Sequence, residues 1–266
     1  MSIKLGAIGG GVMGEAIISR LLAQKAYLGN EIIISEPTLQ RREFLEQQYG
    51  VQTTDDNHLA AQAPILLLAI KPQVFEQVVA KLGDSNPAQL VISILAGVSL
   101  FQLERAFKDR AVVRVMPNTP ATVGAGMTAI AAGSSVSPHQ LELATQIFQA
   151  VGEVVTVPES LMDAVTGLSG SGPAYIAIAI EALADGGVAA GLPRAIADKL
   201  ALQTVLGTAQ LLNQSTLHPA QLKDRVTSPG GTTIAGVTKL EQAGFRSALI
   251  QAVIAAAQRS QELGVK

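Results

Sequence analysis

Residues 9–14 read Gly9-Gly10-Gly11-Val12-Met13-Gly14, a G-x-G-x-x-G pattern between an apolar run, Ile3–Ile8, and a helical stretch, Met13–Lys25. In a strand–turn–helix unit the first glycine permits a tight turn, the second lets the backbone approach a pyrophosphate, and the third allows close helix–strand contact. The helix that follows offers unpaired amides to phosphate oxygens. Because strand and helix flank the glycines in this order, the sequence predicts a dinucleotide-binding turn rather than an ordinary glycine turn. We expect coenzyme contacts from Ile8, Gly9, Gly10, Gly11, Val12, Met13 and Gly14.

The first 158 residues alternate short apolar runs with longer amphipathic stretches. Continuous apolar strands separated by helices are typical of a mainly parallel sheet covered on both faces, so residues 1–158 are expected to form a Rossmann-type α/β domain. The expected strands are Ile3–Ile8, Glu31–Ser35, Ile65–Ile70, Leu90–Ile94, Val112–Met116, Gly126–Ala131 and Glu153–Val157. The expected helices are Met13–Lys25, Leu39–Tyr49, Gln73–Leu82, Leu100–Phe107 and Pro138–Val151.

Residues 159–266 have a different pattern and predict an all-helical domain for substrate binding and dimerisation. From Leu161 onward there is no strand candidate, and Pro173–Ala190 and Pro193–Leu212 each begin with a proline suited to the first helical position. Both stretches are apolar nearly all round, which is typical of helices buried on every side. A domain of this size cannot enclose such helices alone. We therefore expect a homo-oligomer in which a second subunit covers them.

Composition excludes several classes of function. The 266-residue chain has a formal net charge of −2 and a pI near 5.9, so we expect no nucleic-acid partner. Without cysteine there is no thiol nucleophile, and three separated histidines predict no metal site. Apolar runs such as Pro64–Ile70 are too short to cross a bilayer, and the N-terminal residues show no cleavable signal. We expect a cytoplasmic protein with no membrane partner.

The residues after the second expected strand leave the coenzyme type open. Glu36 stands 22 positions after Gly14, where an acidic side chain accepts from a ribose hydroxyl and repels a 2′-phosphate. Arg41 and Arg42 follow, and Ser35 or Thr38 offers hydroxyls to phosphate oxygens. The arginines are equally well explained as a solvated helix face. NADP and NAD both remain candidates.

Further coenzyme ligands are expected where other strands end, because ligands bind at the carboxyl edge of open parallel sheets. Lys71 is placed near the nicotinamide ribose, or it merely marks a strand end. Asn118, in the double-proline loop 116–120, either bonds the carboxamide or holds its turn. The candidates at these strand ends are Ala69, Ile70, Lys71, Pro72, Ala96, Gly97 and Asn118.

Two glycine-rich segments interrupt the helical half. Gly167–Tyr175 is interpreted as a hinge between domains, with close approach to the ligand cleft as the alternative. In 227–233, Thr227-Ser228-Pro229-Gly230-Gly231-Thr232-Thr233, a proline, two glycines and several hydroxyls precede the helical stretch Ile234–Gln242. That combination favours an anion cradle for a carboxylate or phosphate. Ordinary capping by Ser228 or Thr232 is the alternative.

The lysines and histidines favour one kind of reduction. Ketone reduction needs a proton donor for the developing alkoxide, commonly Lys or His. No lysine occurs between Lys108 and Lys199, and the region that enters the helical half has only His139. A protonated imine is already electrophilic and becomes a neutral amine on accepting hydride. The chain is therefore better equipped to reduce a C=N bond than a ketone.

Over nearly its whole length the sequence resembles the pyrroline-5-carboxylate reductase family. The resemblance rests on 9–14, 69–72, 116–120, Gly167–Tyr175, 181–187, His218-Pro219 with 221–224, and most specifically Ser228-Pro229-Gly230-Gly231-Thr232-Thr233. It implies NAD(P)H-dependent reduction of 1-pyrroline-5-carboxylate to L-proline, the last step of proline biosynthesis, usually with NADPH. It also implies interlocking helical domains in a dimer or in a decamer of five dimers.

The resemblance further assigns roles to individual residues. The substrate carboxylate would meet the backbone at Ser228, Gly231 and Thr232, with Gly230 in the same loop. The catalytic candidate, Thr233, would hydrogen-bond the ring nitrogen, while Asn57 would line the coenzyme groove with 69–72. The family commonly has a neutral or hydroxyl residue where Glu36 stands. This departure bears on the preference for NADP and not on the activity. A ketoacid or hydroxyacid dehydrogenase and a dinucleotide-sensing regulator are the alternative functions.

Overall fold

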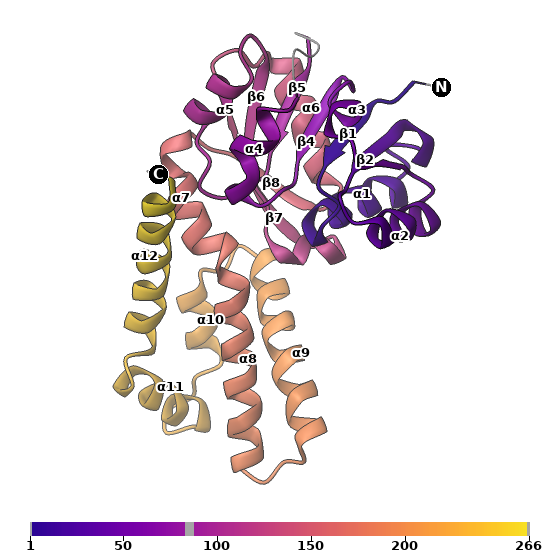
Figure 1. Cartoon of the computed structure of the whole chain (residues 1–266). Helices are drawn as coiled ribbons and strands as arrows, with labels where there is room; N and C mark the ends of the chain where they lie inside the picture. The colour runs from indigo at the N-terminus through magenta and orange to yellow at the C-terminus, as the bar shows by residue number, and fades with distance from the viewer. Residues whose placement is uncertain (1, 83–87, 265–266) are drawn as a thin grey trace. The chain divides into compact units, whose positions relative to one another are not determined.

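The computed structural model describes residues 2–82 and 88–264, which form two compact units (Figure 1). Unit 1 contains the chain up to Ser171 and again from Ala255 onward, and unit 2 contains Gly172–Ile254. The division expected from the sequence, between residues 158 and 159, follows the last strand. The compact units divide later because the turns after that strand, η4 (Glu159–Leu161) and α7 (Met162–Val165), belong to unit 1.

Unit 1 is built on an eight-stranded sheet in the order β3-β2-β1-β4-β5-β6-β7-β8. Its neighbours pair in parallel except β6 and β7, which are antiparallel, so the expected mainly parallel sheet is confirmed. Its strands are β1 (Leu5–Ile8), β2 (Ile32–Ser35), β3 (Gln52–Thr54), β4 (Ile65–Leu68), β5 (Leu90–Ser93), β6 (Ala111–Met116), β7 (Gly126–Ala132) and β8 (Gly152–Thr156). The strand β3, a three-residue polar strand at the edge of the sheet, was not expected because it has no apolar run.

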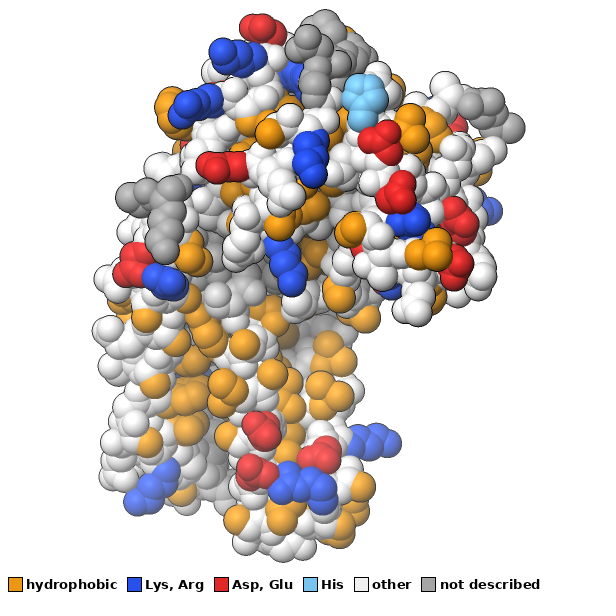
Figure 2. Space-filling view, viewed as in Figure 1, with side chains coloured by type: hydrophobic (Ala, Val, Ile, Leu, Met, Phe, Trp, Pro, Cys, Tyr) orange, Lys and Arg blue, Asp and Glu red, His pale blue; other side chains and the backbone are white. Residues whose placement is uncertain are grey.

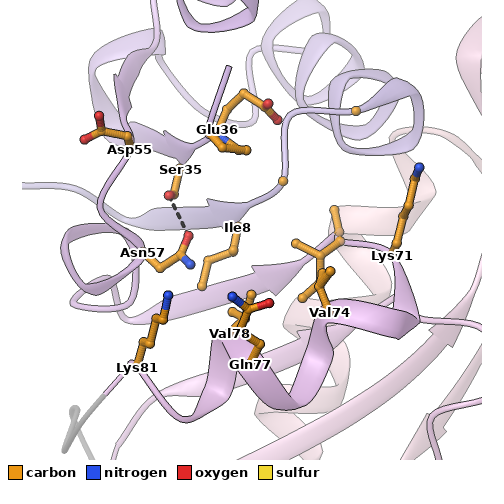
Figure 3. Close-up of a pocket in the computed structure, with 15 residues that line it drawn as sticks. Ile8, Ser35, Glu36, Asp55, Asn57, Lys71, Val74, Gln77, Val78 and Lys81 are labelled. Carbon is orange, nitrogen blue, oxygen red and sulfur yellow. Dashed lines mark hydrogen bonds between the residues drawn. The ribbon is translucent and has the colours of Figure 1, made fainter. Parts of the chain in front are cut away.

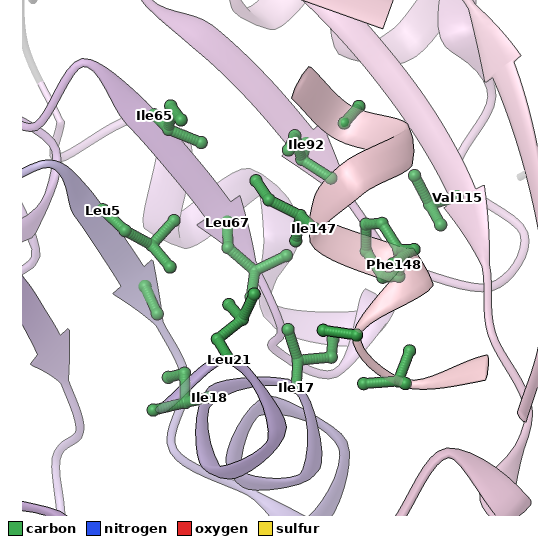
Figure 4. Close-up of a cluster of buried hydrophobic side chains, with 14 of the residues drawn as sticks. Leu5, Ile17, Ile18, Leu21, Ile65, Leu67, Ile92, Val115, Ile147 and Phe148 are labelled. Carbon is green, nitrogen blue, oxygen red and sulfur yellow. The ribbon is translucent and has the colours of Figure 1, made fainter. Parts of the chain in front are cut away.

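Helices cover both faces of this sheet. The remaining helical elements of unit 1 are α1 (Val12–Ala23), α2 (Leu39–Tyr49), α3 (Asn57–Ala60), α4 (Phe75–Val79), α5 (Leu100–Ala106), α6 (Pro138–Gln149), η1 (Gly29–Glu31), η2 (Pro72–Val74), η3 (Thr119–Val123) and η5 (Thr166–Gly170). On one face, Ile17 and Leu21 of α1 and Phe148 of α6 pack on the central strands (Figure 4). On the other, Phe75 of α4 and Leu103 of α5 pack on the same strands. Burial on both faces explains why these strands are continuously apolar.

The expected helices occur with small differences in length. The helix Leu39–Tyr49 begins and ends where the sequence predicts. The expected Gln73–Leu82 is shorter, because η2 precedes α4 and the last residues close in tight turns from Lys81 to Val78 and from Leu82 to Val79. The chain returns to unit 1 at its C-terminal end, where Ser260 donates to Asp163 Oδ1 at 2.6 Å.

Unit 2 is helical throughout. It contains α8 (Gly172–Ala189), α9 (Arg194–Asn213), α10 (Pro219–Arg225), α11 (Thr232–Gln242) and the first part of α12 (Phe245–Gly264). Its one buried apolar cluster among the described residues is small, consisting of Ala184, Ala197 and Ala201. Side chains such as Ile178 and Leu202 are 64% and 56% exposed, and Figure 2 shows hydrophobic side chains spread over the surface of these helices.

A single chain therefore leaves α8 and α9 partly exposed, and the cover that the sequence led us to expect is that of a second subunit. One chain does not enclose them, because the buried apolar cluster between α8 and α9 in the described residues is limited to three alanines. Their apolar composition requires cover from outside the chain, as the sequence predicted. No helix within residues 2–82 and 88–264 has the length and apolar character needed to cross a membrane.

Candidate active site

The strand order reverses direction around β1, which pairs with β2 on one side and β4 on the other. Ile8 is level with both Ser35 and Leu68, so the three strands end at the same edge. In open α/β sheets this switch point is where nucleotides bind. A cavity of about 570 Å³ opens there in unit 1 (Figure 3). It is lined by Ile8, Gly9, Gly11, Ser35, Glu36, Pro37, Asp55, Asn57, Ala69, Ile70, Lys71, Val74, Gln77, Val78 and Lys81.

The glycine turn has the geometry that a pyrophosphate requires. Gly9 has φ +105°, and a Cβ there would lie 2.5 Å from the Ala69 carbonyl oxygen. A Cβ at Gly14 would lie 2.5 Å from the Gly9 carbonyl oxygen, so this glycine lets α1 approach the turn closely. A Cβ at Gly11 would meet no atom within 4 Å, and Gly11 is the N-cap of α1, which no side chain caps. The space above Gly11 and the helix amides therefore fit a diphosphate.

Two of the expected ligands meet on the wall of the cavity. The Ser35 hydroxyl donates to Asn57 Oδ1 at 2.7 Å, which links the end of β2 to the start of α3 (Figure 3). Asp56 caps α3 through its carboxylate, which accepts from the His58 amide at 2.8 Å. Because this bond holds the turn, Asn57 presents its amide to the cavity in a defined position.

Six lining residues were missed by sequence analysis: Pro37, Asp55, Val74, Gln77, Val78 and Lys81. Asp55 follows the polar strand β3, so overlooking that strand also hid the residue at its end. Pro37 follows β2, while the other four follow β4 on η2, α4 and the turn after α4. Their position could have been inferred from Ala69–Pro72, because residues that directly follow a strand lie at the ligand-binding edge of the sheet.

Expected ligands that do not themselves line the cavity are Gly10, Val12, Met13 and Gly14 in the glycine turn and α1, and Pro72 on η2. Three further expected coenzyme ligands lie elsewhere in unit 1. Ala96 and Gly97 do not line the cavity, and Gly97 lies against Leu263 and Gly264 of the last helix. Asn118 donates to the Ser169 carbonyl oxygen at 3.2 Å and accepts from the Met127 amide at 2.9 Å. Its amide thus holds its own loop to β7 and to η5. A role for these three residues at the coenzyme stays a prediction.

The predicted anion cradle is an exposed loop at the start of α11 in unit 2. Gly231 is the N-cap of α11 and no side chain caps this helix, so the alternative of capping by Ser228 or Thr232 does not describe this structure. Gly230 has φ +66°, and the Gly231 amide donates to the Ser228 carbonyl oxygen at 3.1 Å. The first amides of α11 have no partner within the helix. The loop can therefore donate several backbone hydrogen bonds to one anion.

The segment Gly167–Tyr175 lies where the chain changes from one compact unit to the other, between Ser171 and Gly172. It includes most of a π-helical turn, Thr166–Gly170, and Ser171 separates this turn from α8. A Cβ at Gly170 would lie 2.7 Å from the Met116 methyl group, so glycine allows close packing there, whereas a Cβ at Gly172 would meet nothing within 4 Å. This position agrees with the hinge interpretation.

A glycine turn and a cavity at the switch point of a doubly wound sheet define a dinucleotide-binding protein. Residues 4–97 match the family of coenzyme F420-dependent NADP oxidoreductases, and residues 159–263 match the pyrroline-5-carboxylate reductase dimerisation domain. The chain is 64% identical to pyrroline-5-carboxylate reductase from Synechocystis over 100% of both chains. It is 41% identical to the Escherichia coli protein of that name over 99% of each chain.

Solved structures agree with these sequences. Pyrroline-5-carboxylate reductase from Coxiella burnetii superposes with a TM-score of 0.89, at 37% identity and 98% coverage of both chains. The Plasmodium falciparum enzyme, solved with NADP bound, has a TM-score of 0.88, at 31% identity and 98% coverage of both. The chain belongs to the pyrroline-5-carboxylate reductase family.

Proposed function

We propose that this chain reduces 1-pyrroline-5-carboxylate to L-proline with NADPH or NADH. The observation that carries the proposal is the uncapped start of α11 in a chain that also has a dinucleotide cavity. When bound, the reduced nicotinamide supplies a hydride. A second site for a small anion is what an imino acid needs, whereas a dinucleotide-sensing regulator needs none.

The loop 228–232 binds the substrate carboxylate. The backbone turns at Gly230 with a positive φ, and the glycines leave the following amides accessible to a ligand. A carboxylate at a helix N-terminus accepts from several amides and interacts favourably with the helix dipole. Backbone donors carry no net charge, so they bind the carboxylate without placing a positive charge beside the protonated imine.

Thr233 orients the C=N bond. It lies in the first turn of α11, directly after the carboxylate-binding amides, and its side chain is half-buried. In 1-pyrroline-5-carboxylate the ring nitrogen is two bonds from the carboxylate carbon, so a hydroxyl beside the carboxylate site reaches the nitrogen. A protonated imine needs no side-chain acid during hydride addition, and a hydroxyl that fixes its orientation is sufficient.

The experiment compares Thr233→Ala with Thr238→Ala, a threonine on the same helix whose hydroxyl donates to the Ile234 carbonyl oxygen at 2.8 Å. The assay follows oxidation of NADPH and of NADH with 1-pyrroline-5-carboxylate, and with small ketoacids as competing substrates. We expect pyrroline-dependent turnover that falls roughly tenfold to a hundredfold in the Thr233 variant and little in the control. Turnover of ketoacids instead, or no turnover of the pyrroline, would overturn the proposed function.

The oligomer forms part of this proposal. Apolar side chains exposed on α8 and α9, among them Ile178 and Leu202, support a homo-oligomer, either a dimer or a decamer of five dimers. Ile178→Asp places a charge on this face, and we expect a smaller species than the unaltered chain in analytical ultracentrifugation. An unaltered chain that sediments as a monomer would contradict the proposal. A cytoplasmic location stays a prediction, which cell fractionation would test.

A further inference from the structure

We propose that Glu36 sets the coenzyme choice of this enzyme by weakening the binding of coenzymes that carry a 2′-phosphate, so that the chain accepts NADH alongside NADPH. The inference rests on the proposed function, since it concerns the coenzyme site of the same reductase. It depends on three features of unit 1: the position of the Glu36 carboxylate and the partners of Arg41 and Arg42.

Glu36 is fixed at the edge of the coenzyme cavity. It follows the last residue of β2, and its carboxylate accepts from the Gly10 amide and from the Thr38 amide, both at 3.1 Å. One of these donors belongs to the glycine turn and the other to the start of α2. The carboxylate is therefore held beside the turn and cannot swing away without losing both bonds. This is the place where an acidic side chain accepts from an adenosine ribose hydroxyl.

Arg41 is held by partners in the glycine turn and on α1. Its Nε donates to the Gly10 carbonyl oxygen at 2.7 Å, and its guanidinium also pairs with Glu15. The Tyr49 hydroxyl donates to the same carboxylate at 2.6 Å. Burial alone would raise the pKa of Glu15, but these hydrogen bonds and the arginine charge lower it below its ordinary value. Arg41 thus holds the glycine turn from behind.

Arg42 also has partners around Glu36. Its Nη1 donates to the Glu36 carbonyl oxygen at 2.8 Å and to the Pro37 carbonyl oxygen at 3.0 Å. Its Nη2 lies 3.5 Å from Asp55, which itself lines the cavity. The sequence allowed both arginines to be phosphate ligands or a solvated helix face, and the structure gives them a third role, supporting the backbone around Glu36.

The charges that line this part of the cavity are consequently negative. Glu36 and Asp55 line it where β2 and β3 end, and Lys71 and Lys81 line it after β4 (Figure 3). Two unit charges about 4 Å apart repel by about 1 kcal/mol even in bulk water, roughly a fivefold loss of affinity. A phosphate monoester carries up to about two charges at neutral pH, so the expected loss is roughly tenfold or more.

The test measures dissociation constants for NADPH and NADH by nucleotide fluorescence with Glu36→Gln, Glu36→Ser and a control, Glu43→Gln. Glu43 is an exposed carboxylate on α2 that does not line the cavity. We expect each Glu36 variant to raise the affinity for NADPH relative to NADH by roughly tenfold. The control should leave that ratio unchanged. Glu36 variants whose ratio matches that of the control would overturn the inference.

Arg41→Met supplies a second, independent arm. If Arg41 supports the glycine turn, its loss lowers the affinity for NADPH and the affinity for NADH by the same factor, since both coenzymes carry the pyrophosphate. A loss confined to NADPH would show that Arg41 binds the 2′-phosphate and would overturn the inference. The titrations contain no pyrroline, so they separate the two proposals. If the unaltered chain shows no turnover of the pyrroline while its Glu36 variants show the expected change in ratio, the proposed function is refuted and the coenzyme inference stands.

Discussion

Two substitutions in the glycine turn add the same methyl group, but one is expected to weaken coenzyme binding and the other to lower stability. At Gly11 the added Cβ meets nothing within 4 Å, and the residue has φ −71°, which alanine adopts freely. At Gly14 the added Cβ meets the Gly9 carbonyl oxygen at 2.5 Å and the Ala69 Cβ at 3.3 Å. Gly11→Ala should therefore act on the bound coenzyme, and Gly14→Ala on the fold.

The magnitudes follow from these contacts. Gly11→Ala changes only the N-cap of α1, which costs up to about 1 kcal/mol of stability. Gly14→Ala forces α1 away from the turn, a steric conflict worth about 1–3 kcal/mol. In the bound state the methyl group at Gly11 occupies space needed by the pyrophosphate, and a similar conflict lowers coenzyme affinity by roughly 5- to 150-fold.

Two measurements check this prediction: urea denaturation without coenzyme, and titration of NADPH and NADH by fluorescence. Gly11→Ala should unfold near the midpoint of the unaltered chain but bind both coenzymes weakly. Gly14→Ala should unfold at a clearly lower urea concentration. The reasoning is refuted if Gly11→Ala is the less stable of the two, or if it binds both coenzymes as tightly as the unaltered chain.

Two further predictions concern ion pairs in unit 1. Glu159→Gln should lower the free energy of unfolding by about 1–3 kcal/mol in urea denaturation. The side chain of Arg114, which is 9% exposed, loses its charged partner at 2.9 Å. Glu159 is 32% exposed, so water reduces the size of this loss. An unchanged midpoint would contradict this. Glu15 is stabilised in its charged form by Tyr49 and Arg41, so its pKa in the folded chain lies below the ordinary value of 4.5. Its contribution to stability is present above that value and is lost as the pH falls through the folded pKa. The Tm of the unaltered chain should therefore fall more steeply below about pH 5 than that of Glu15→Gln; parallel Tm curves would refute the assignment.

Much of the fold could be predicted because its signals are local. The helix Leu39–Tyr49 and the apolar strands β4 and β5 follow from residues within the elements themselves. The edge strand β3 could not be predicted, since Gln52–Thr54 becomes a strand only by pairing with β2. The extent of α4 likewise depended on tight turns after Val79 that its sequence does not announce.

The candidate site divides in the same way. The glycine turn, Glu36 and the loop before α11 were recognisable because their backbone chemistry is written in consecutive residues. Asp55 and Lys81 were not, because they reach the cavity from segments far apart in sequence. Asn118 illustrates the opposite case, a plausible ligand whose amide the structure shows bonded to Ser169 and Met127.

The sequence by itself determined the order of elements, the dinucleotide turn and the excess of apolar helix surface, because glycine spacing and hydrophobic periodicity act over a few residues. Only the tertiary structure decided what the charged residues beside the turn do. The spacing of Arg41 and Arg42 on α2 is compatible either with binding a phosphate or with facing the solvent. Their partners, Gly10 and Glu15 for one and Glu36 and Asp55 for the other, come from other elements. A side chain's charge is read from sequence, but which group neutralises it depends on contacts that only folding creates.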